Sequence, residues 1–467
     1  MATLIRNGTI VTAVERFKGD ILIDGEKITA IGTGLEGRAE EIVDAEGKYI
    51  LPGGIDGHTH FSLPFMGTST AGFETTLAAI VGGTTTIVDF APQPQGMFLL
   101  DSIAKHREEK AEGKSVVDFG FHAMVMDAHK GIFEEPPALV KAGITTIKLF
   151  MAYKGTPFYS DDATIFQMLQ KTKEVGMLTM LHAENGDVID ILQKQLVAEG
   201  KTDPQYHAAS RPTVVEAEAT ARATSLASAA NAPVFVVHIS CTEAMTAVRD
   251  ARHRGITAFG ETCPQYLVLA VDNLAKPNFE GAKYVCSPPL RDSWHHDRLW
   301  ESIQQGWLQV VGSDHCGFNF KGQKEMGRGD FTKIPNGAPG VENRLAILYT
   351  YGVLTGKLSL ERMVDVFATA PAKFYGLYPQ KGSISVGADA DIVILDPEYS
   401  GKISVETSLQ GIDFNAYEGF EQRGRPDKVF LRGKLSVKDG KFVGELGQGK
   451  FLERQPYGLA YATLCRE

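Results

Sequence analysis

Two histidines one residue apart, His58 and His60, end the apolar run that leads out of a Leu-Pro-Gly-Gly turn in the segment Ile-Asp-Gly-His-Thr-His. Because alternate side chains of a strand leave the same face, both imidazoles are expected on one side of the chain, where they can share a metal ion. Single polar residues end later apolar runs in the same way, namely Lys148, His182, His238 and Asp314. This pattern predicts an open metal site built from the ends of several strands.

Lys148 stands where a core residue is expected. The segment Gly-Ile-Thr-Thr-Ile-Lys-Leu-Phe resembles Gly-Thr-Thr-Thr-Ile-Val-Asp-Phe earlier in the chain, and Lys148 takes the place of Val88. A buried ammonium without a partner is strongly disfavoured, or its pKa falls and a neutral amine remains. A neutral amine can react with carbon dioxide to give a carbamate, a carboxylate able to bridge two cations. The alternative is a lysine that merely reaches solvent from a strand end.

Other polar residues in the sequence are given structural roles. Asp89, His122 and Glu261 also end apolar runs. They either line the barrel mouth or, as we expect, hydrogen-bond neighbouring strands or loops. His315 is expected to point away from Asp314, its neighbour on a strand. The remaining histidines in helical or loop stretches are expected at the surface, including His106, His129, His253, His295 and His296.

Apolar runs alternate with helical stretches at intervals of roughly 30 residues or more, which is the rhythm of a parallel α/β sheet. One helical stretch is expected to begin at Asp162 as N-cap and to stop at Gly176. The runs end near His60, Asp89, His122, Lys148, His182, His238, Glu261 and Asp314. Eight such units predict a closed (β/α)8 TIM-like barrel, which brings the strand ends together at one mouth.

Both ends of the chain are typical of β structure. Residues 1 to about 50 read as short strands separated by Asn-Gly, Asp-Gly and Glu-Gly turns, the pattern of antiparallel hairpins, and the same texture returns from about Gly382. We predict a small β-sandwich domain from residues 1–50 and 380–445, a metal-dependent barrel over 51–379, and a tail over 446–467 that takes part in oligomer contacts.

Composition narrows the function classes. With 467 residues and 43% hydrophobic content, the chain can bury a full core. The net charge of −10 and the lack of a long basic run argue against nucleic acid as a partner. No signal-peptide pattern or membrane-spanning apolar stretch is seen, so no membrane partner and a cytoplasmic location are expected. Five scattered cysteines without Cys-x-x-Cys spacing predict neither disulfides nor a structural zinc site.

On its motifs the chain resembles the cyclic amidohydrolases of the amidohydrolase superfamily, and most closely their dihydropyrimidinase and D-hydantoinase group. The resemblance covers essentially the whole sequence. Its motifs are Pro-Gly-Gly-Ile-Asp-Gly-His-Thr-His, Lys-Leu-Phe-Met-Ala-Tyr, His-Ala-Glu-Asn-Gly, Val-Val-His, Gly-Glu-Thr-Cys-Pro-Gln-Tyr-Leu and Gly-Ser-Asp-His.

The resemblance implies two divalent metal ions, usually zinc and sometimes manganese or cobalt. By that resemblance, His58, His60 and Asp314 hold one ion. His182 and His238 hold the other, and an N6-carboxylated Lys148 bridges both together with a hydroxide. The hydroxide attacks the ring carbonyl, and Asp314 acts first as general base and then as general acid toward the leaving nitrogen.

The resemblance also assigns substrate contacts. Tyr153 is expected to stabilise the tetrahedral oxyanion, and backbone groups of Ser287 and Asn336 to pair with the cyclic imide. The implied reaction opens 5,6-dihydropyrimidines, such as dihydrouracil, and 5-substituted hydantoins to N-carbamoyl amino acids. A homotetramer, or a homodimer, is implied as well.

Three alternatives remain at this point. Dihydroorotases and allantoinases typically follow His-x-His with an arginine-bearing loop, whereas this chain continues Phe-Ser-Leu-Pro-Phe-Met-Gly. We therefore expect an apolar pocket for the exocyclic group, walled by Leu63, Phe65, Phe150 and Phe158. Non-enzymatic collapsin-response mediator proteins lack the full ligand set, which is complete here. A mononuclear deaminase would not need Lys148.

Overall fold

Within residues 2–457, the part of the chain that the computed structural model describes, eight parallel strands form one sheet in the order β17-β16-β15-β14-β13-β12-β11-β8. Beyond the two outer strands, Thr59 pairs with His315, and the His60 N–H donates to the His315 carbonyl at 2.8 Å. This pairing closes the sheet, so the predicted TIM-like barrel is confirmed. Its strands are β8 (Gly54–Thr59), β11 (Thr84–Pro92), β12 (Asp118–Met124), β13 (Thr146–Phe150), β14 (Leu178–His182), β15 (Val234–Val236), β16 (Ala258–Thr262) and β17 (Val310–Val311).

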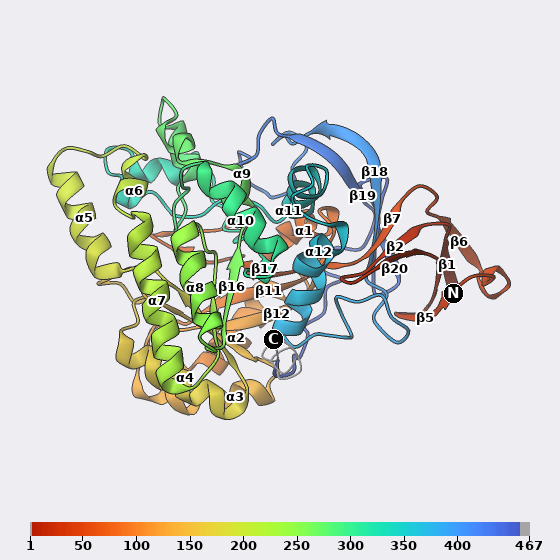
Figure 1. Cartoon of the computed structure of the whole chain (residues 1–467), viewed down its shortest axis with the longest axis horizontal. Coiled ribbons are helices and arrows are strands. Elements are labelled where there is room, and N and C mark those ends of the chain that lie inside the picture. The colour runs from red at the N-terminus through yellow and green to blue at the C-terminus, as the bar shows by residue number, and fades with distance from the viewer. Residues whose placement is uncertain (1, 458–467) are drawn as a thin grey trace.

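Helices follow the strands and cover the outside of the barrel (Figure 1). None of the helices in residues 2–457 combines the length and the apolar character that crossing a bilayer requires. The α-helices are α1 (Leu77–Val81), α2 (Leu99–His106), α3 (Pro136–Lys141), α4 (Asp162–Val175), α5 (Gly186–Ala198), α6 (Tyr206–Ala209), α7 (Thr213–Ala230), α8 (Thr242–His253), α9 (Pro264–Val268), α10 (Trp294–Gln304), α11 (Arg344–Ile347), α12 (Leu360–Val364) and α13 (Ala370–Phe374).

Helix α4 shows how the sequence sets an element's limits. It ends before Gly176, which has a left-handed φ of 72° as expected for a C-terminal glycine. Its N-cap, however, is Asp161 and not Asp162. Asp161 has extended backbone, and its side chain accepts a hydrogen bond from the Thr164 N–H at 2.8 Å. Two adjacent aspartates offer the same cap chemistry, and only the backbone conformation selects between them.

Segments from both chain ends build two further sheets beside the barrel, on the right in Figure 1. Buried isoleucines from both sheets, such as Ile5 and Ile392, pack together between them, so the β-sandwich is confirmed. In the described residues the first sheet has the order β5-β4-β1-β6 and the second β21-β20-β19-β18-β7-β2-β3. The strands are β1 (Ala2–Arg6), β2 (Thr9–Val11), β3 (Arg16–Lys18), β4 (Asp20–Asp24), β5 (Lys27–Gly32), β6 (Glu41–Asp44), β7 (Tyr49–Pro52), β18 (Ile392–Lys402), β19 (Glu421–Leu431), β20 (Lys434–Lys438) and β21 (Lys441–Phe442).

The expectation of successive hairpins at the N-terminus was only partly right. Asp24 and Gly25 do join the antiparallel pair β4 and β5. Asn7 and Gly8, in contrast, carry the chain from one sheet into the other, where β1 pairs with β4 and β6 and β2 pairs with β3 and β7. A Cβ at Gly8 would lie 2.4 Å from Cδ1 of Ile50, so this crossing passes close to the sandwich core.

A C-terminal strap, residues 449–455, runs along the N-terminal ends of β12 and β13. The Leu452 N–H donates to the Phe119 carbonyl at 2.8 Å, and the Arg454 N–H donates to the Gly143 carbonyl at 3.0 Å. The Arg454 side chain is buried, and its guanidinium donates to the Phe121 carbonyl and to Oγ1 of Thr146. The described part of the tail therefore packs on its own barrel. The proposed oligomer contact of the tail falls partly on residues 458–467, outside the described residues.

Buried charges join the barrel to the sandwich. Lys381 donates to Asp118 at the start of β12, at 2.6 Å, and to Asp391 at 2.7 Å. Arg432, at the end of β19, donates to the same Asp118. These carboxylates and Lys381 are nearly inaccessible to solvent. The contact between the two units thus depends on an ion-pair network in addition to apolar packing.

Candidate metal centre and substrate pocket

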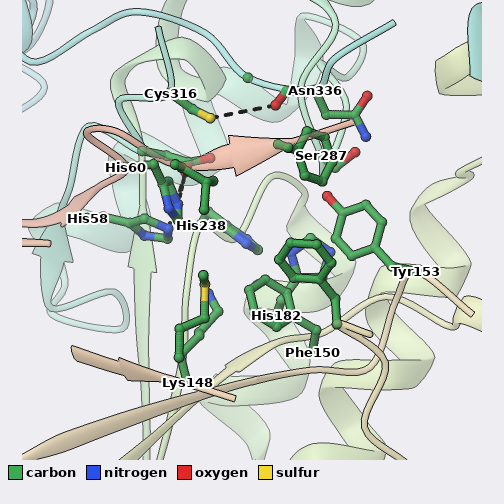
Figure 2. Close-up of a pocket in the computed structure, with 16 residues that line it drawn as sticks. His58, His60, Lys148, Phe150, Tyr153, His182, His238, Ser287, Cys316 and Asn336 are labelled. Carbon is green, nitrogen blue, oxygen red and sulfur yellow. Dashed lines mark hydrogen bonds and ion pairs between the residues drawn. The ribbon is translucent and has the colours of Figure 1, made fainter. Parts of the chain in front are cut away.

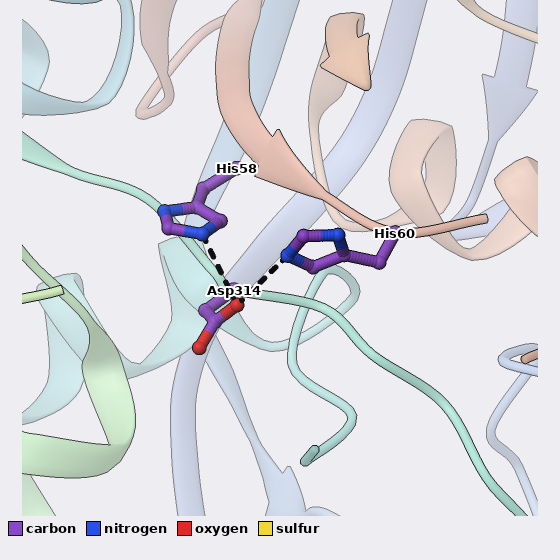
Figure 3. Close-up of side chains that lie close together, drawn as sticks. All are labelled: His58, His60 and Asp314. Atoms are coloured by element: carbon purple, nitrogen blue, oxygen red, sulfur yellow. Dashed lines mark ion pairs between the residues drawn. The ribbon is translucent and has the colours of Figure 1, made fainter. Parts of the chain in front are cut away.

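Three side chains at the barrel mouth form a compact metal-binding group (Figure 3). His58 lies in β8, His60 directly follows it, and Asp314 lies in the loop after β17. One carboxylate oxygen, Oδ1 of Asp314, is 3.2 Å from Nε2 of His58 and 3.3 Å from Nε2 of His60. One ligand atom from each of the three residues lies within 4.8 Å of the others, so a single ion can contact all three.

Lys148, His182 and His238 lie across the same pocket (Figure 2). The ring centroids of His182 and His238 are 4.5 Å apart, and those of His58 and His238 are 5.3 Å apart. Lys148 in β13 is buried, with its Nζ 5.0 Å from the ring centroid of Phe90. The structure therefore brings all six predicted ligands to one pocket.

The chemistry of this donor set fits metal ions. Among the described residues, Nε2 of His58 and Nδ1 of His238 are buried atoms without a hydrogen-bond partner. Burial lowers the pKa of His58, His182 and His238, which favours the neutral imidazole that binds metals. Burial opposes ionisation of Asp314, but the neighbouring His58 and His60 outweigh it and hold its pKa below the ordinary value. The site thus offers neutral imidazoles and a charged carboxylate.

Burial also affects Lys148, lowering its pKa to about 7 against the opposing charges of Asp314 and Glu261. A substantial fraction of this amine is therefore neutral at physiological pH.

Two carboxylates orient the histidines from behind. Oε1 of Glu261 lies 2.5 Å from Nδ1 of His58, and Oε2 of Glu184 lies 2.7 Å from Nε2 of His182. Each contact leaves the other ring nitrogen facing the pocket. Arg211 also donates to Glu184, at 2.8 Å. Burial raises the pKa of Glu261 to about 8, whereas in Glu184 the charge of Arg211 and the bond to His182 outweigh burial and lower it to about 2.

Sequence reasoning missed both orienting carboxylates. Glu261 was expected to bond to neighbouring strands or loops and was left out of the predicted site, but its position in β16 places its carboxyl group against the predicted ligand His58. Glu184 stands two residues after His182 in His-Ala-Glu, and this spacing was an available signal. Arg211 carried no local signal, because it is distant in sequence from both.

The other strand-end residues behave as expected. Asp89 accepts from Oγ1 of Thr59 at 2.7 Å and from the Phe61 N–H at 2.9 Å, which fixes the segment that carries both mouth histidines. His122 contacts the Gly57 carbonyl through Nε2 at 2.9 Å.

His315 is buried, and its Nδ1 accepts a hydrogen bond from the Gly340 N–H at 3.2 Å. The strand alternation assumed for Asp314 and His315 does not apply, because β17 ends at Val311 and Asp314 has a left-handed φ of 50°.

The predicted surface position was wrong for two histidines. His106 and His295 are buried, although each lies in a helix of mixed polarity. His106 packs against the ring edges of Phe73 and Phe121, and His295 accepts from the Thr242 N–H at 3.2 Å. Both lie on the buried face of their helix, His106 three residues after Ile103 and His295 four residues before Leu299, and this helical spacing was an available signal.

The predicted substrate residues line one wall of the pocket. Tyr153 has a left-handed φ of 64°, and its hydroxyl is directed toward Ser287 and Asn336 (Figure 2). Burial raises the pKa of Tyr153 to about 12, so the hydroxyl keeps its proton and can donate. Leu63, Phe65, Phe150 and Phe158 line the same pocket. A second cavity of about 360 Å³ shares Phe65, Tyr153, Phe158 and Asn336 with it, so the two spaces adjoin.

Known proteins share this architecture and sequence. The amidohydrolase family pattern matches residues 49–436. A D-hydantoinase from Geobacillus stearothermophilus is 50% identical over 465 residues, which are 99% of this chain and 98% of the relative. A D-hydantoinase from Streptomyces coelicolor is 48% identical over 460 residues, which are 97% of this chain and 98% of the relative. The crystal structure of a dihydropyrimidinase from Brevibacillus agri has a TM-score of 0.96 and 51% identity, with 98% of this chain and 99% of that chain covered.

The chain therefore belongs to the amidohydrolase family. Within that family it is a hydrolase acting on cyclic amides, as the resemblance of its motifs indicated, and it groups with the D-hydantoinases and dihydropyrimidinases.

Proposed function

We propose that this enzyme opens the ring of 5,6-dihydropyrimidines and 5-substituted hydantoins to give N-carbamoyl amino acids. This proposal rests on one observation: six side chains of metal-ligand type, a tyrosine hydroxyl and an apolar wall line a single pocket at the barrel mouth. Because the relatives are named D-hydantoinase, we propose that this chain acts on the D-enantiomer of substituted hydantoins.

The proposed cofactors are two divalent ions, most simply zinc, with manganese or cobalt as substitutes. His58, His60 and Asp314 would hold one, His182 and His238 the other, and an N6-carboxylated Lys148 both. When bound, such ions lower the pKa of water and polarise a substrate carbonyl.

The chain's own groups supply the remaining chemistry. Asp314 takes the proton from the attacking water and returns it to the ring nitrogen that leaves, because an amide anion is a poor leaving group. The Tyr153 hydroxyl donates to the carbonyl oxygen as negative charge develops on it. Main-chain groups of Ser287 and Asn336 pair with the C=O and N–H edge of the ring, which fixes its orientation.

The pocket walls support an uncharged substituent. Leu63, Phe65, Phe150 and Phe158 would surround the exocyclic group, and the adjoining cavity offers it room. The lining of that cavity includes Lys154 and Arg211, which are ion-paired with Asp187 and Glu184. Among the described residues that line the catalytic pocket, Lys148 is the one lysine or arginine, and it lies among the proposed metal ligands. An acidic substrate such as dihydroorotate would find no free cation there.

The test is a substrate panel on purified, metal-loaded protein with dihydrouracil, 5-phenylhydantoin, dihydroorotate and allantoin. We expect ring opening of the first two only, followed by loss of ring absorbance and by product chromatography. Turnover of dihydroorotate alone would contradict the apolar pocket. Failure on all four with metal bound would favour a non-enzymatic relative.

The bridging role of Lys148 gives a separate prediction. Lys148→Ala should lose the metal pair, because it removes the side chain proposed to contact both ions. Short carboxylic acids should restore part of the lost metal binding. The metal content of the purified variant, measured by mass spectrometry, tests this prediction. Lys154→Ala, which changes an exposed lysine, is the matched control. Unchanged metal content in Lys148→Ala would remove the bridge.

Three further expectations belong to this proposal. They are a homotetramer or homodimer, a cytoplasmic location, and the domain limits 1–50 plus 380–445, 51–379 and 446–467. The first is tested by light scattering on the purified protein.

A further inference from the structure

Two segments of the pocket wall come from distant parts of the chain and meet beside Tyr153. One contains Val285 and Ser287, and the other contains Asn336 and Gly337. They contact each other directly, because the Gly337 N–H donates to the Val285 carbonyl at 3.0 Å. Their spacing sets how far apart the groups proposed to bind the ring lie.

Lys324 joins the same two segments. It lies in the loop after β17, and its side chain is fully buried. Its Nζ donates to the Val285 carbonyl at 2.7 Å and to the Gly337 carbonyl at 2.6 Å. One ammonium group therefore holds the backbone of both segments just behind the residues that face the pocket.

Packing does not explain a lysine at this position. A desolvated ammonium is unfavourable unless it is paired, and no ion pair of Lys324 occurs among the described residues. A methionine of similar length would fill the space without that penalty. What the lysine adds is a pair of strong, charge-assisted hydrogen bonds with fixed lengths.

Each segment is otherwise held on its own side. Nε2 of His207 lies 2.9 Å from the Cys286 carbonyl and 3.3 Å from Oγ of Ser287. Gly337 is packed against Cys316 so closely that an added Cβ would lie 2.6 Å from the Cys316 Cβ. These contacts fix each segment to its own surroundings. The segments are connected to each other by the Gly337 N–H bond to the Val285 carbonyl and by the two bonds from Lys324.

We infer that Lys324 is a positioning residue that sets the spacing of the two ring-binding segments. This inference rests on the proposed function, because it is Ser287 and Asn336 that are proposed to contact the substrate. Lys324 itself does not line the pocket and does not touch the proposed metal ligands.

The kinetic test replaces Lys324 with methionine. For Lys324→Met we expect KM for dihydrouracil and 5-phenylhydantoin to rise about tenfold or more, with a smaller change in kcat and unchanged metal content. Both substrates should be affected alike, because they share the ring edge. Lys321→Met, an exposed lysine in the same loop, is the matched control and should keep the wild-type KM.

The conservative variant Lys324→Gln keeps two N–H donors on a shorter arm and should restore part of the lost affinity. It also carries the test if Lys324→Met does not yield folded protein. An unchanged KM in both variants would overturn the inference.

Hydrogen exchange followed by mass spectrometry gives a readout that does not depend on activity. Peptides covering residues 280–290 and 330–340 should exchange faster in Lys324→Met than in wild type and in Lys321→Met. If wild type opens none of the rings but this exchange increases, the proposed function fails and the positioning role stands. If wild type is active and neither exchange nor KM changes, the positioning role fails alone.

Discussion

At the scale of single residues, the site depends on side chains that do not face the substrate. An imidazole can bind a metal through either nitrogen, and the partner of the other nitrogen decides which one is available. Glu261 settles this for His58, and Glu184 settles it for His182. These two contacts thus direct one nitrogen of each ring toward the proposed metal positions.

Glu261→Gln is predicted to weaken metal binding about tenfold to a hundredfold, because an amide holds the His58 imidazole less firmly than the Glu261 carboxyl group, whose Oε1 lies 2.5 Å from Nδ1 of His58. Competition against a coloured chelator measures the dissociation constant directly. The exposed Glu243→Gln on α8 is the control. Equal affinity in the two variants would show that Glu261 does not support the site.

The buried His106 gives a pH-dependent prediction. Burial lowers its pKa to about 4, whereas the unfolded chain titrates near the ordinary value. Between these two values the unfolded chain binds a proton that the folded chain does not, so stability falls as the pH falls.

Replacing His106 by phenylalanine should therefore reduce the loss of stability between pH 7.5 and pH 5 by about 2 kcal/mol. Denaturation midpoints of wild type and His106→Phe at both pH values provide the measurement. His253→Phe changes an exposed histidine and should leave the pH dependence as it is. The same pH dependence in all three proteins would contradict the assignment.

At the scale of elements, the alternation of apolar runs and helical stretches predicted the barrel and the polar residues at its mouth. A polar residue that ends an apolar run must lie near the mouth once the strands are parallel, which is why the six proposed ligands could be placed at one mouth without a structure. Their separation from Asp89, His122 and Glu261, which end apolar runs too, depended on the resemblance of the motifs.

Contacts between loops follow no such alternation. Lys324 and Arg211 act on partners far away in sequence, and no local pattern identifies those partners. The choice between Asp161 and Asp162, and the crossing at Gly8, likewise depend on tertiary packing.

The C-terminal strap gives a prediction at this scale. Arg454→Met removes a guanidinium that bonds to β12 and β13 from below, and it leaves the Phe121 carbonyl without that donor. We expect a loss of about 1–3 kcal/mol of stability, observed as a shorter half-life at elevated temperature. Lys450→Met, which changes a half-exposed side chain in the same strap, should have little effect. A half-life equal to that of wild type would mean that the strap is held by its backbone alone.

At the scale of the whole molecule, the barrel and the sandwich are joined by buried charges of opposite sign. Lys381 neutralises Asp118 of the barrel and Asp391 of the sandwich together. Because Lys381 and both carboxylates are buried and in close contact, removing one of these charges is expected to lower the free energy of unfolding.

Lys381→Met should destabilise the protein by about 3–5 kcal/mol, because it removes the buried ammonium that pairs with both Asp118 and Asp391 and leaves Arg432 as the remaining cation beside Asp118. Lys27→Met breaks a half-exposed pair with Asp389 and should change stability by about 1 kcal/mol or less. Urea denaturation of both variants compares them. Equal midpoints would show that the carboxylates are neutral or hydrated in the folded protein.

The order of strands in the larger sandwich sheet constrains how the chain is made. β2 and β7 leave the ribosome early, yet their sheet is completed by β18–β21, and the strap that underlies the barrel comes later still. The apolar faces of the first strands therefore remain uncovered while the whole barrel is synthesised. The native seven-stranded sheet can form only after β18–β21 have emerged, and until then the early strands present apolar surface of the kind that chaperones bind.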